Sequence, residues 1–129
     1  MTAAPEPEWL TPEDALLFHD QLIAAFGGAP GVRDKTLLES AMGRPRHVFA
    51  YESQDLCVLA TAYAYGIAKN HPFVDGNKRV AFVLACVFLG LNDIRLEPPE
   101  AEAVVMVEGL ASGQVSEADF VKWLRKHSR

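Results

Sequence analysis

The apolar positions along most of this chain recur three or four residues apart, a spacing that predicts helices. The segment Thr11-Pro12-Glu13-Asp14 predicts the start of the first helix, where Thr11 suits a cap, Pro12 the first helical position and Asp14 the reciprocal place of a capping box. Gly27-Gly28 ends it. Asp34 predicts a second, short helix that ends at Gly43, and the aperiodic stretch 44–53 predicts a loop that crosses the surface.

Two later segments are apolar on nearly all sides, which is typical of buried helices. They run from about residue 55 to 69 and from 77 to about 90, and residues 70–76 interrupt them. A short extended piece at 94–96, a helix from Pro98-Pro99 to about Ala111 and a last helix after Ser116 complete the pattern. We therefore expect an all-α, compact single-domain bundle of about six helices over residues 1–129. Two central helices are buried, and residues 1–9 form a flexible extension.

The charge of the chain argues against nucleic acid as a direct partner. It has 129 residues with 12 Lys and Arg against 17 Asp and Glu, a net charge of −5. Binding to a phosphate backbone usually needs a strongly basic face. The basic cluster in the last helix suits a helix C-terminus better than a nucleic-acid tail; it consists of Lys122, Arg125, Lys126 and Arg129.

Because we recognise no targeting segment and the cysteines lie in apolar runs, we expect a cytoplasmic protein. The first seven residues have neither a basic start nor an apolar stretch, so they do not form a signal peptide. The longest apolar run, Val80 to Leu91, is shorter than the ~20 residues that span a bilayer. Cys57 and Cys86 lie inside apolar runs, where we expect reduced, buried thiols that act as small hydrophobic residues.

The break between the two central helices collects residues that suit phosphate binding. It lies at the start of a helix, where free N–H groups and the helix dipole favour an anion. Gly76 permits close approach of a ligand to the backbone, and Asn77 is expected to cap the helix and direct its amide toward a phosphate or metal oxygen. Lys78 and Arg79 supply positive charge in an otherwise acidic protein.

The same window contains residues that suit acid–base and metal chemistry. Asp75 is its only acid, and Mg²⁺ shared with phosphates needs one or two carboxylates. His71 can exchange a proton near neutral pH, and Phe73 is expected to anchor the loop to the core. Each has a structural alternative, since a histidine before proline often ends a helix and Asp-Gly-Asn is a common turn. Their conjunction favours a phosphoryl- or nucleotidyl-transfer site.

Residues 71–79, His-Pro-Phe-Val-Asp-Gly-Asn-Lys-Arg, resemble the signature loop of the Fic superfamily, HPFx(D/E)GN followed by a basic helix start. Lys78 makes the loop similar to the Doc ("death on curing") toxin branch. The resemblance covers the chain from about residue 10 onward. It includes four further segments: Leu17 to Asp20, Phe26 to Gly31, the Tyr51-Glu52 region and Gly113 to Ser116.

This resemblance implies roles for the loop residues. His71 would be the base that deprotonates a target hydroxyl, and Asp75 would carry Mg²⁺. Four residues would bind the phosphates of ATP: Gly76, Asn77, Lys78 and Arg79. Lys69 lies where the Doc branch tends to have a basic residue that contributes to nucleotide binding.

The resemblance also implies which group is transferred. AMP-transferring Fic enzymes have a loop ending Gly-Asn-Gly-Arg-x-x-Arg, whereas this chain has Lys78 and Phe82 in place of the second Gly and the last Arg. The Doc branch is associated with transfer of the γ-phosphate to a threonine of elongation factor Tu. We therefore expect a bacterial or phage-encoded toxin kinase that arrests translation. An AMP-transferring enzyme and a non-catalytic nucleotide-binding module are the alternatives.

A toxin needs an inhibitor, and no inhibitory segment is evident in this chain. Many Fic proteins carry Ser/Thr-x-x-x-Glu-Gly/Asn; here Glu108-Gly109 is the nearest match, but Val104 stands at the hydroxyl position. The resemblance implies inhibition by a Phd-type antitoxin whose segment folds on binding. A groove between the first helix and the core is the expected place.

Overall fold

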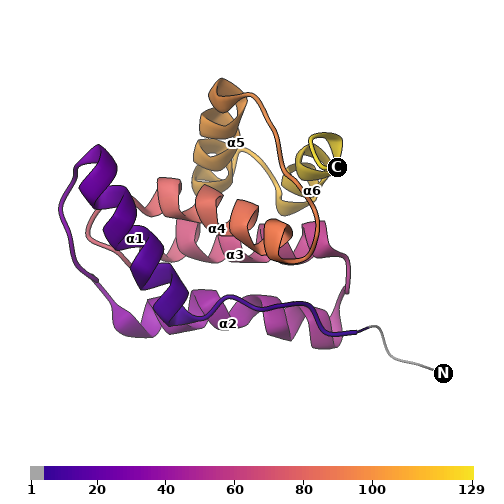
Figure 1. Cartoon of the computed structure of the whole chain (residues 1–129), viewed down its shortest axis with the longest axis horizontal. Coiled ribbons are helices and arrows are strands. Elements are labelled where there is room, and N and C mark those ends of the chain that lie inside the picture. The colour runs from indigo at the N-terminus through magenta and orange to yellow at the C-terminus, as the bar shows by residue number, and fades with distance from the viewer. Residues whose placement is uncertain (1–4) are drawn as a thin grey trace.

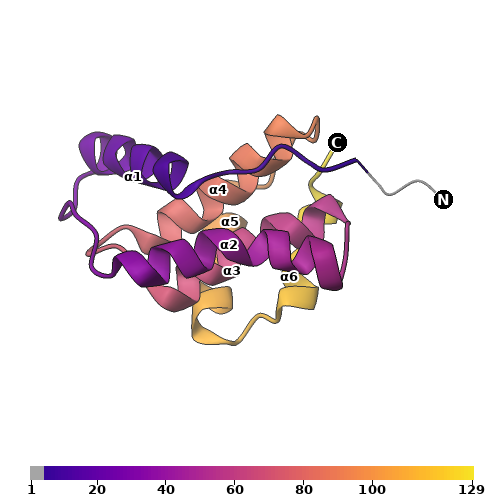
Figure 2. The ribbon, with the colours of Figure 1, turned by 90° about the horizontal axis from the view of Figure 1, so that it is seen from below.

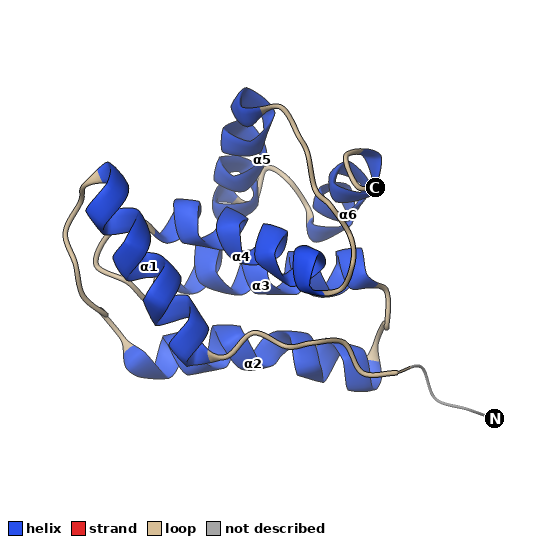
Figure 3. Ribbon diagram, in the orientation of Figure 1, coloured by secondary structure: helices blue, strands red, loops and turns tan. Residues whose placement is uncertain are grey.

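Helices account for the regular structure of residues 5–129, the part of the chain described by this computed structural model (Figure 3). The all-α prediction is confirmed. In chain order the helices are α1 (Pro12–Phe26), α2 (Lys35–Tyr51), α3 (Leu56–Asn70), α4 (Asn77–Leu91), α5 (Glu100–Ser112) and α6 (Glu117–Lys126).

Helices α3 and α4 lie side by side at the centre, as expected from their apolar sequences (Figure 1). Helix α2 runs along α3 on one side (Figure 2), and α5 and α6 pack against α3 on the other (Figure 1). Helix α1 crosses the N-terminal half of α4 (Figure 1). Both central helices are lined with fully buried side chains, including Leu59 and Ile67 in α3 and Leu84 and Phe88 in α4. The loop between α3 and α4 therefore has a rigid support on each side.

The start of α1 confirms the predicted capping box. The Thr11 hydroxyl accepts a hydrogen bond from the Asp14 amide at 3.2 Å, and the Asp14 carboxylate accepts one from the Thr11 amide at 2.8 Å. Each partner satisfies an amide that the helix leaves without an internal acceptor. Gly113, with φ +87°, similarly ends α5 where a glycine was expected.

Helix α2 corrects the sequence prediction. The expected short helix and surface loop form one continuous helix that runs through Gly43 and Pro45 to Tyr51. Leu38, Ala41, Pro45 and Val48 are buried along it at helical spacing. Packing of this face against α3 outweighs the unfavourable helix propensities of glycine and proline. Helix propensity is a weak predictor where a helix makes a long apolar contact with its neighbour.

The chain before α1 is held against the core at residues that we expected in a flexible extension. Glu8 exchanges two backbone hydrogen bonds with the Asn92 side chain, and the Trp9 ring stacks on Phe88 with centroids 6.0 Å apart. Residues 1–4 lie outside the described part. The expected extended piece is confirmed at Leu96, which forms an isolated antiparallel bridge with Ser128.

The two cysteines are free, as expected, but they differ in burial. Cys57 is buried, and Cys86 is half-buried. Burial raises the pKa of the Cys86 thiol to about 11, so it remains protonated at neutral pH. In residues 5–129 no helix is both long enough and apolar enough to cross a membrane.

Candidate active site

The irregular loop between α3 and α4 begins at His71, whose backbone is left-handed with φ 49° and ψ 55°. This conformation is uncommon outside glycine and ends α3 abruptly. The His71 amide still donates to the Ile67 carbonyl at 3.1 Å, while its side chain is exposed. The imidazole therefore stands in solvent at the start of the loop and is not packed into the core.

The connection between α1 and α2 holds this loop through hydrogen bonds of residues 31–34. The amides of Arg33 and Asp34 both donate to the Pro72 carbonyl, at 2.7 and 3.0 Å, and the Val74 amide donates to the Gly31 carbonyl at 3.0 Å. The Arg33 guanidinium then donates to the carbonyls of His71 at 2.7 Å and of residue 70 at 2.8 Å. These last carbonyls of α3 lie at the negative end of the helix dipole, where a cation is favourable.

Phe73 and Asn77 form the buried inner side of the loop. Phe73 is 1% exposed, which places it as the predicted anchor in the core. The Asn77 side-chain oxygen accepts from the Phe73 amide at 3.0 Å, and its amide donates back to the Phe73 carbonyl at 3.0 Å. The prediction that Asn77 caps α4 is wrong: Gly76 is the cap residue, and no side chain caps the helix. Asn77 instead turns inward to satisfy the loop backbone, with its amide 3.4 Å from His71 Nδ1.

Asp75 is exposed and is held by three hydrogen bonds at different atoms. Its Oδ1 accepts from the Gly76 amide at 2.9 Å, and its Oδ2 accepts from the Ala29 amide at 3.2 Å. Its main-chain oxygen lies 2.8 Å from Nε2 of His19. Gly28, with φ +113°, is required here, because a Cβ at that position would lie 2.9 Å from Asp75 Oδ2.

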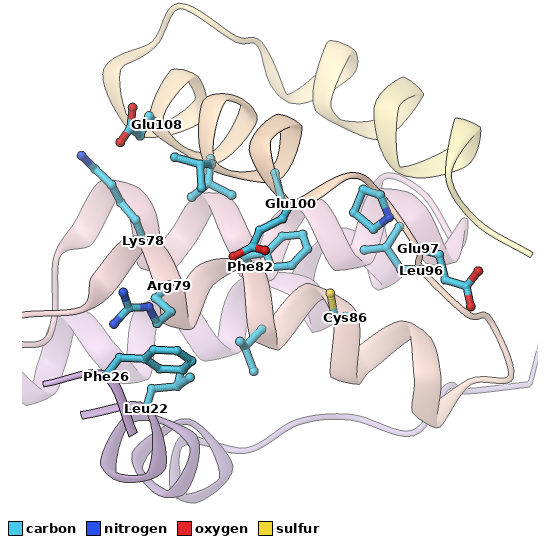
Figure 4. A pocket seen from close by; sticks show the side chains of 15 residues that line it. Leu22, Phe26, Lys78, Arg79, Phe82, Cys86, Leu96, Glu97, Glu100 and Glu108 are labelled. Carbon is cyan, nitrogen blue, oxygen red and sulfur yellow. The ribbon is translucent and has the colours of Figure 1, made fainter. Parts of the chain in front are cut away.

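Helix α4 presents its uncapped first turn beside this carboxylate. Gly76 (φ 78°) leads into the helix, and the exposed side chains of Lys78 and Arg79 follow. Lys78 extends toward the α5 side near Glu108, whereas the Arg79 guanidinium lies 4.6 Å above the Phe26 ring on the α1 side (Figure 4). Lys69 is exposed at the end of α3 near Gly113.

Lys78 and Arg79 also border a groove of about 730 Å³ between α1, α4 and α5 (Figure 4). Its walls are mostly apolar and include Leu22, Phe82 and Val104. His71 and Asp75 do not line it. The structure thus separates an exposed polar site at the loop from an apolar groove, and the two basic residues lie at their boundary.

The site has one carboxylate available for a metal ion. Among residues 5–129 there is no group of three or more His, Cys, Asp and Glu side chains arranged to hold a cation. A lone exposed carboxylate next to a free helix N-terminus still suits Mg²⁺, because this ion usually takes one or two protein carboxylates and completes its shell with phosphate oxygens and water. Asp75 meets that description.

Sequence reasoning missed two side chains that shape the site, His19 and Arg33. His19 had a usable signal: it shares a helical face with Ala15 and Leu22, so a polar residue stands at a core position. Arg33 had none, because its contacts with the end of α3 depend on how the α1–α2 connection folds back.

Comparisons with known proteins identify the family of this chain. The model of the Fic/DOC family matches residues 9–89. The chain is 33% identical over 119 residues to the protein kinase doc of Escherichia phage P1, covering 91% of this chain and 93% of that protein. It is 40% identical over 91 residues to the toxin Doc of Mycolicibacterium smegmatis, covering 69% of this chain and 68% of that protein. The chain therefore belongs to the Fic/DOC family.

Proposed function

We propose that this protein is the toxin of a toxin–antitoxin pair and a kinase that transfers the γ-phosphate of ATP to a protein hydroxyl. A threonine of elongation factor Tu is the proposed acceptor, and arrest of translation in the cytoplasm is the proposed outcome. The observation that carries the proposal is the loop itself: an exposed imidazole, an exposed carboxylate and an uncapped helix N-terminus lie within residues 71–79. The two relatives, one named as a kinase and the other as a toxin, support it.

The proposed reaction assigns one step to each group. The His71 imidazole takes the proton of the acceptor hydroxyl, whose oxygen forms a bond to the γ-phosphorus. The bond from that phosphorus to the β–γ bridging oxygen breaks, and ADP leaves. The first amides of α4, with Lys78 and Arg79, neutralise the phosphates. Asn77 serves this arrangement as a brace, since its side chain is occupied by Phe73.

Asp75 is the proposed ligand of Mg²⁺. The ion would neutralise phosphate charge and orient the triphosphate. Because both carboxylate oxygens already accept backbone hydrogen bonds, the side chain is oriented before the ion binds. Lys69, exposed at the end of α3, is a proposed additional contact for the nucleotide.

Labelled ATP tests the transferred group. Purified protein is incubated with elongation factor Tu and with ATP labelled at either the α or the γ position, and the modified residue is identified by mass spectrometry. Label on the target from γ-labelled ATP alone supports the kinase. Label from α-labelled ATP would establish AMP transfer instead.

A matched pair of histidine variants tests whether the site is catalytic. We expect His71→Ala to abolish transfer and relieve growth arrest on expression. His47→Ala is the control, because His47 is an exposed histidine of α2 that lies outside the loop. Equal toxicity of the His71→Ala variant and the parent would point to a binding module without catalysis.

We also propose that the groove between α1, α4 and α5 receives an amphipathic segment of a Phd-type antitoxin. Its walls are mostly apolar, and Lys78, Glu97 and Glu100 among its lining residues offer charges of both signs. An occupant would lie against Arg79 and Phe26 and so reach the edge of the proposed phosphate site. Inhibition would follow from this proximity.

Two neighbouring valines of α5 provide the test. Val104 lines the groove, and Val105 is exposed but does not line it. We expect Val104→Glu to abolish co-purification with the antitoxin encoded beside this gene and its rescue of growth, because a buried carboxylate would be unpaired. Val105→Glu should retain both. Identical behaviour of the two variants would exclude this groove.

A further inference from the structure

Three polar side chains are buried among the described residues, and two of them contact the loop between α3 and α4. These three are His19, Thr61 and Asn77. Thr61 donates to the Cys57 carbonyl within its own helix at 2.8 Å, so its burial is explained locally. Asn77 braces Phe73 from inside the loop. His19 comes from α1 and reaches the loop across the fold.

The His19 ring is held on two sides. It is 2% exposed and lies parallel to the Phe73 ring, with centroids 4.0 Å apart and an interplanar angle of 6°. Its Nε2 lies 2.8 Å from the main-chain oxygen of Asp75. Because a carbonyl oxygen can only accept, Nε2 must carry the proton in this contact. The ring therefore has one tautomer and one orientation when it is neutral.

The contact between His19 and the Asp75 carbonyl adjoins the groups that the proposed reaction needs. The peptide that His19 holds joins Asp75, the proposed Mg²⁺ ligand, to Gly76, which starts α4. A Cβ on Gly76 would lie 3.5 Å from Ile23 and 3.8 Å from His19, so α1 forms the surface on which this peptide rests. The Ala29 amide holds the same aspartate from its side chain. Release of the main-chain contact would let the carboxylate and the first amides of α4 rotate together.

We propose that His19 is a positioning residue: its Nε2–H and its stacked ring fix the Asp75–Gly76 peptide, and thereby aim the metal-binding carboxylate and the amides of α4 at the phosphates. This inference rests on the proposed function for its consequence in catalysis, but the brace itself belongs to the free protein. Loss of a group that orients a metal ligand typically costs 10- to 100-fold in metal affinity.

Two substitutions separate the hydrogen bond from the packing. His19→Phe keeps a flat ring against Phe73 and removes the donor. His19→Gln loses the stacked ring but keeps an N–H at a similar distance from the backbone. Leu124→Ala is the control, because Leu124 is fully buried in α6, and the helices that α6 packs against are α3 and α5, whereas His19 lies in α1. It loses stability without touching the brace.

The first measurement uses free protein and needs no activity. We expect His19→Phe to raise hydrogen exchange of the amides in residues 73–77 at least tenfold, His19→Gln to raise it less, and Leu124→Ala to leave it unchanged relative to the rest of the chain. In wild-type protein the imidazole NMR signals of His19 should show a proton on Nε2 that is hydrogen-bonded to a carbonyl oxygen. A ring protonated only at Nδ1, or unchanged loop exchange in His19→Phe, would overturn the proposal. If His19→Phe fails to fold, hydrogen exchange of the loop in His19→Gln and the wild-type imidazole spectrum decide whether His19 braces the loop.

The second measurement concerns the ligand. At fixed ATP, the Mg²⁺ concentration that gives half-maximal transfer should rise about tenfold in His19→Phe and be largely restored in His19→Gln. An unchanged Mg²⁺ dependence in His19→Phe would overturn the positioning role. If wild-type protein transfers neither phosphate nor AMP, the proposed function fails, whereas hydrogen exchange still decides whether His19 braces the loop.

Discussion

Replacing Asn77 with alanine tests whether this side chain is a structural brace or a ligand of the nucleotide. In the structure its oxygen and its amide are each bonded to the backbone of Phe73, at 3.0 Å. Both residues are buried, Asn77 at 5% exposure and Phe73 at 1%. In Asn77→Ala the Phe73 N–H and C=O lose their partners in a place that water reaches poorly.

The expected loss of stability follows from those two groups. An unsatisfied buried donor or acceptor costs about 1–3 kcal/mol, so the two groups together predict a loss of roughly 2–6 kcal/mol in the free energy of unfolding. For a chain of this length that corresponds to a fall in Tm of roughly 10–20 °C. Native domains are typically stable by about 5–15 kcal/mol, so the variant should still fold.

Urea unfolding followed by circular dichroism, without nucleotide, measures this loss. Asn92→Ala is the matched control, since Asn92 also brackets a backbone segment with its amide, at the far end of α4. We expect both variants to be destabilised but only Asn77→Ala to lose transfer activity. Unchanged stability of Asn77→Ala together with lost ATP binding would refute the brace and show that the amide contacts the ligand.

Three further predictions concern the supports of the loop and the bundle. Arg33→Ala should lower kcat at least tenfold and Arg33→Lys less, because the guanidinium holds the carbonyl of left-handed His71; equal kcat for both variants and the parent would contradict this. Gly66→Ala should destabilise the protein by about 1–3 kcal/mol in thermal unfolding, since its Cβ would lie 3.0 Å from the backbone of α2; a higher Tm would show that α2 moves aside. Burial raises the pKa of the Asp55 carboxyl, but hydrogen bonds from Arg125 and two backbone amides outweigh it and hold that pKa below its usual value. Its contribution is therefore present above about pH 4 and lost as the pH falls through the lowered pKa, so Tm measured from pH 2 to 7 should fall less steeply at the acid end in Asp55→Asn than in the parent.

Signals that act over a few residues predicted most of the helices. The capping box at Thr11 and the glycine after α5 both act within one helical turn, and both are present as expected. The continuous apolar runs predicted the two central helices because no other long element buries all its sides. The full length of α2 was not predicted, because Gly43 and Pro45 are local signals for the end of a helix. Only the long contact with α3 shows that the helix continues through them.

The chemistry of the site was readable in the sequence, but its geometry was not. The order of residues 71–79 places an imidazole, a carboxylate and two cations within nine residues, whatever the rest of the chain does. His19 and Arg33 reach this loop through contacts between residues 56 and 38 apart in the chain, and Asn77 turns inward to the backbone of Phe73, four residues away, because both residues are buried. Capping and spacing rules describe neighbours along the chain, whereas buried polar groups take whatever partner the packed fold brings to them. The sequence order thus determines which residue types the candidate site contains, and burial in the packed fold determines how their side chains are oriented.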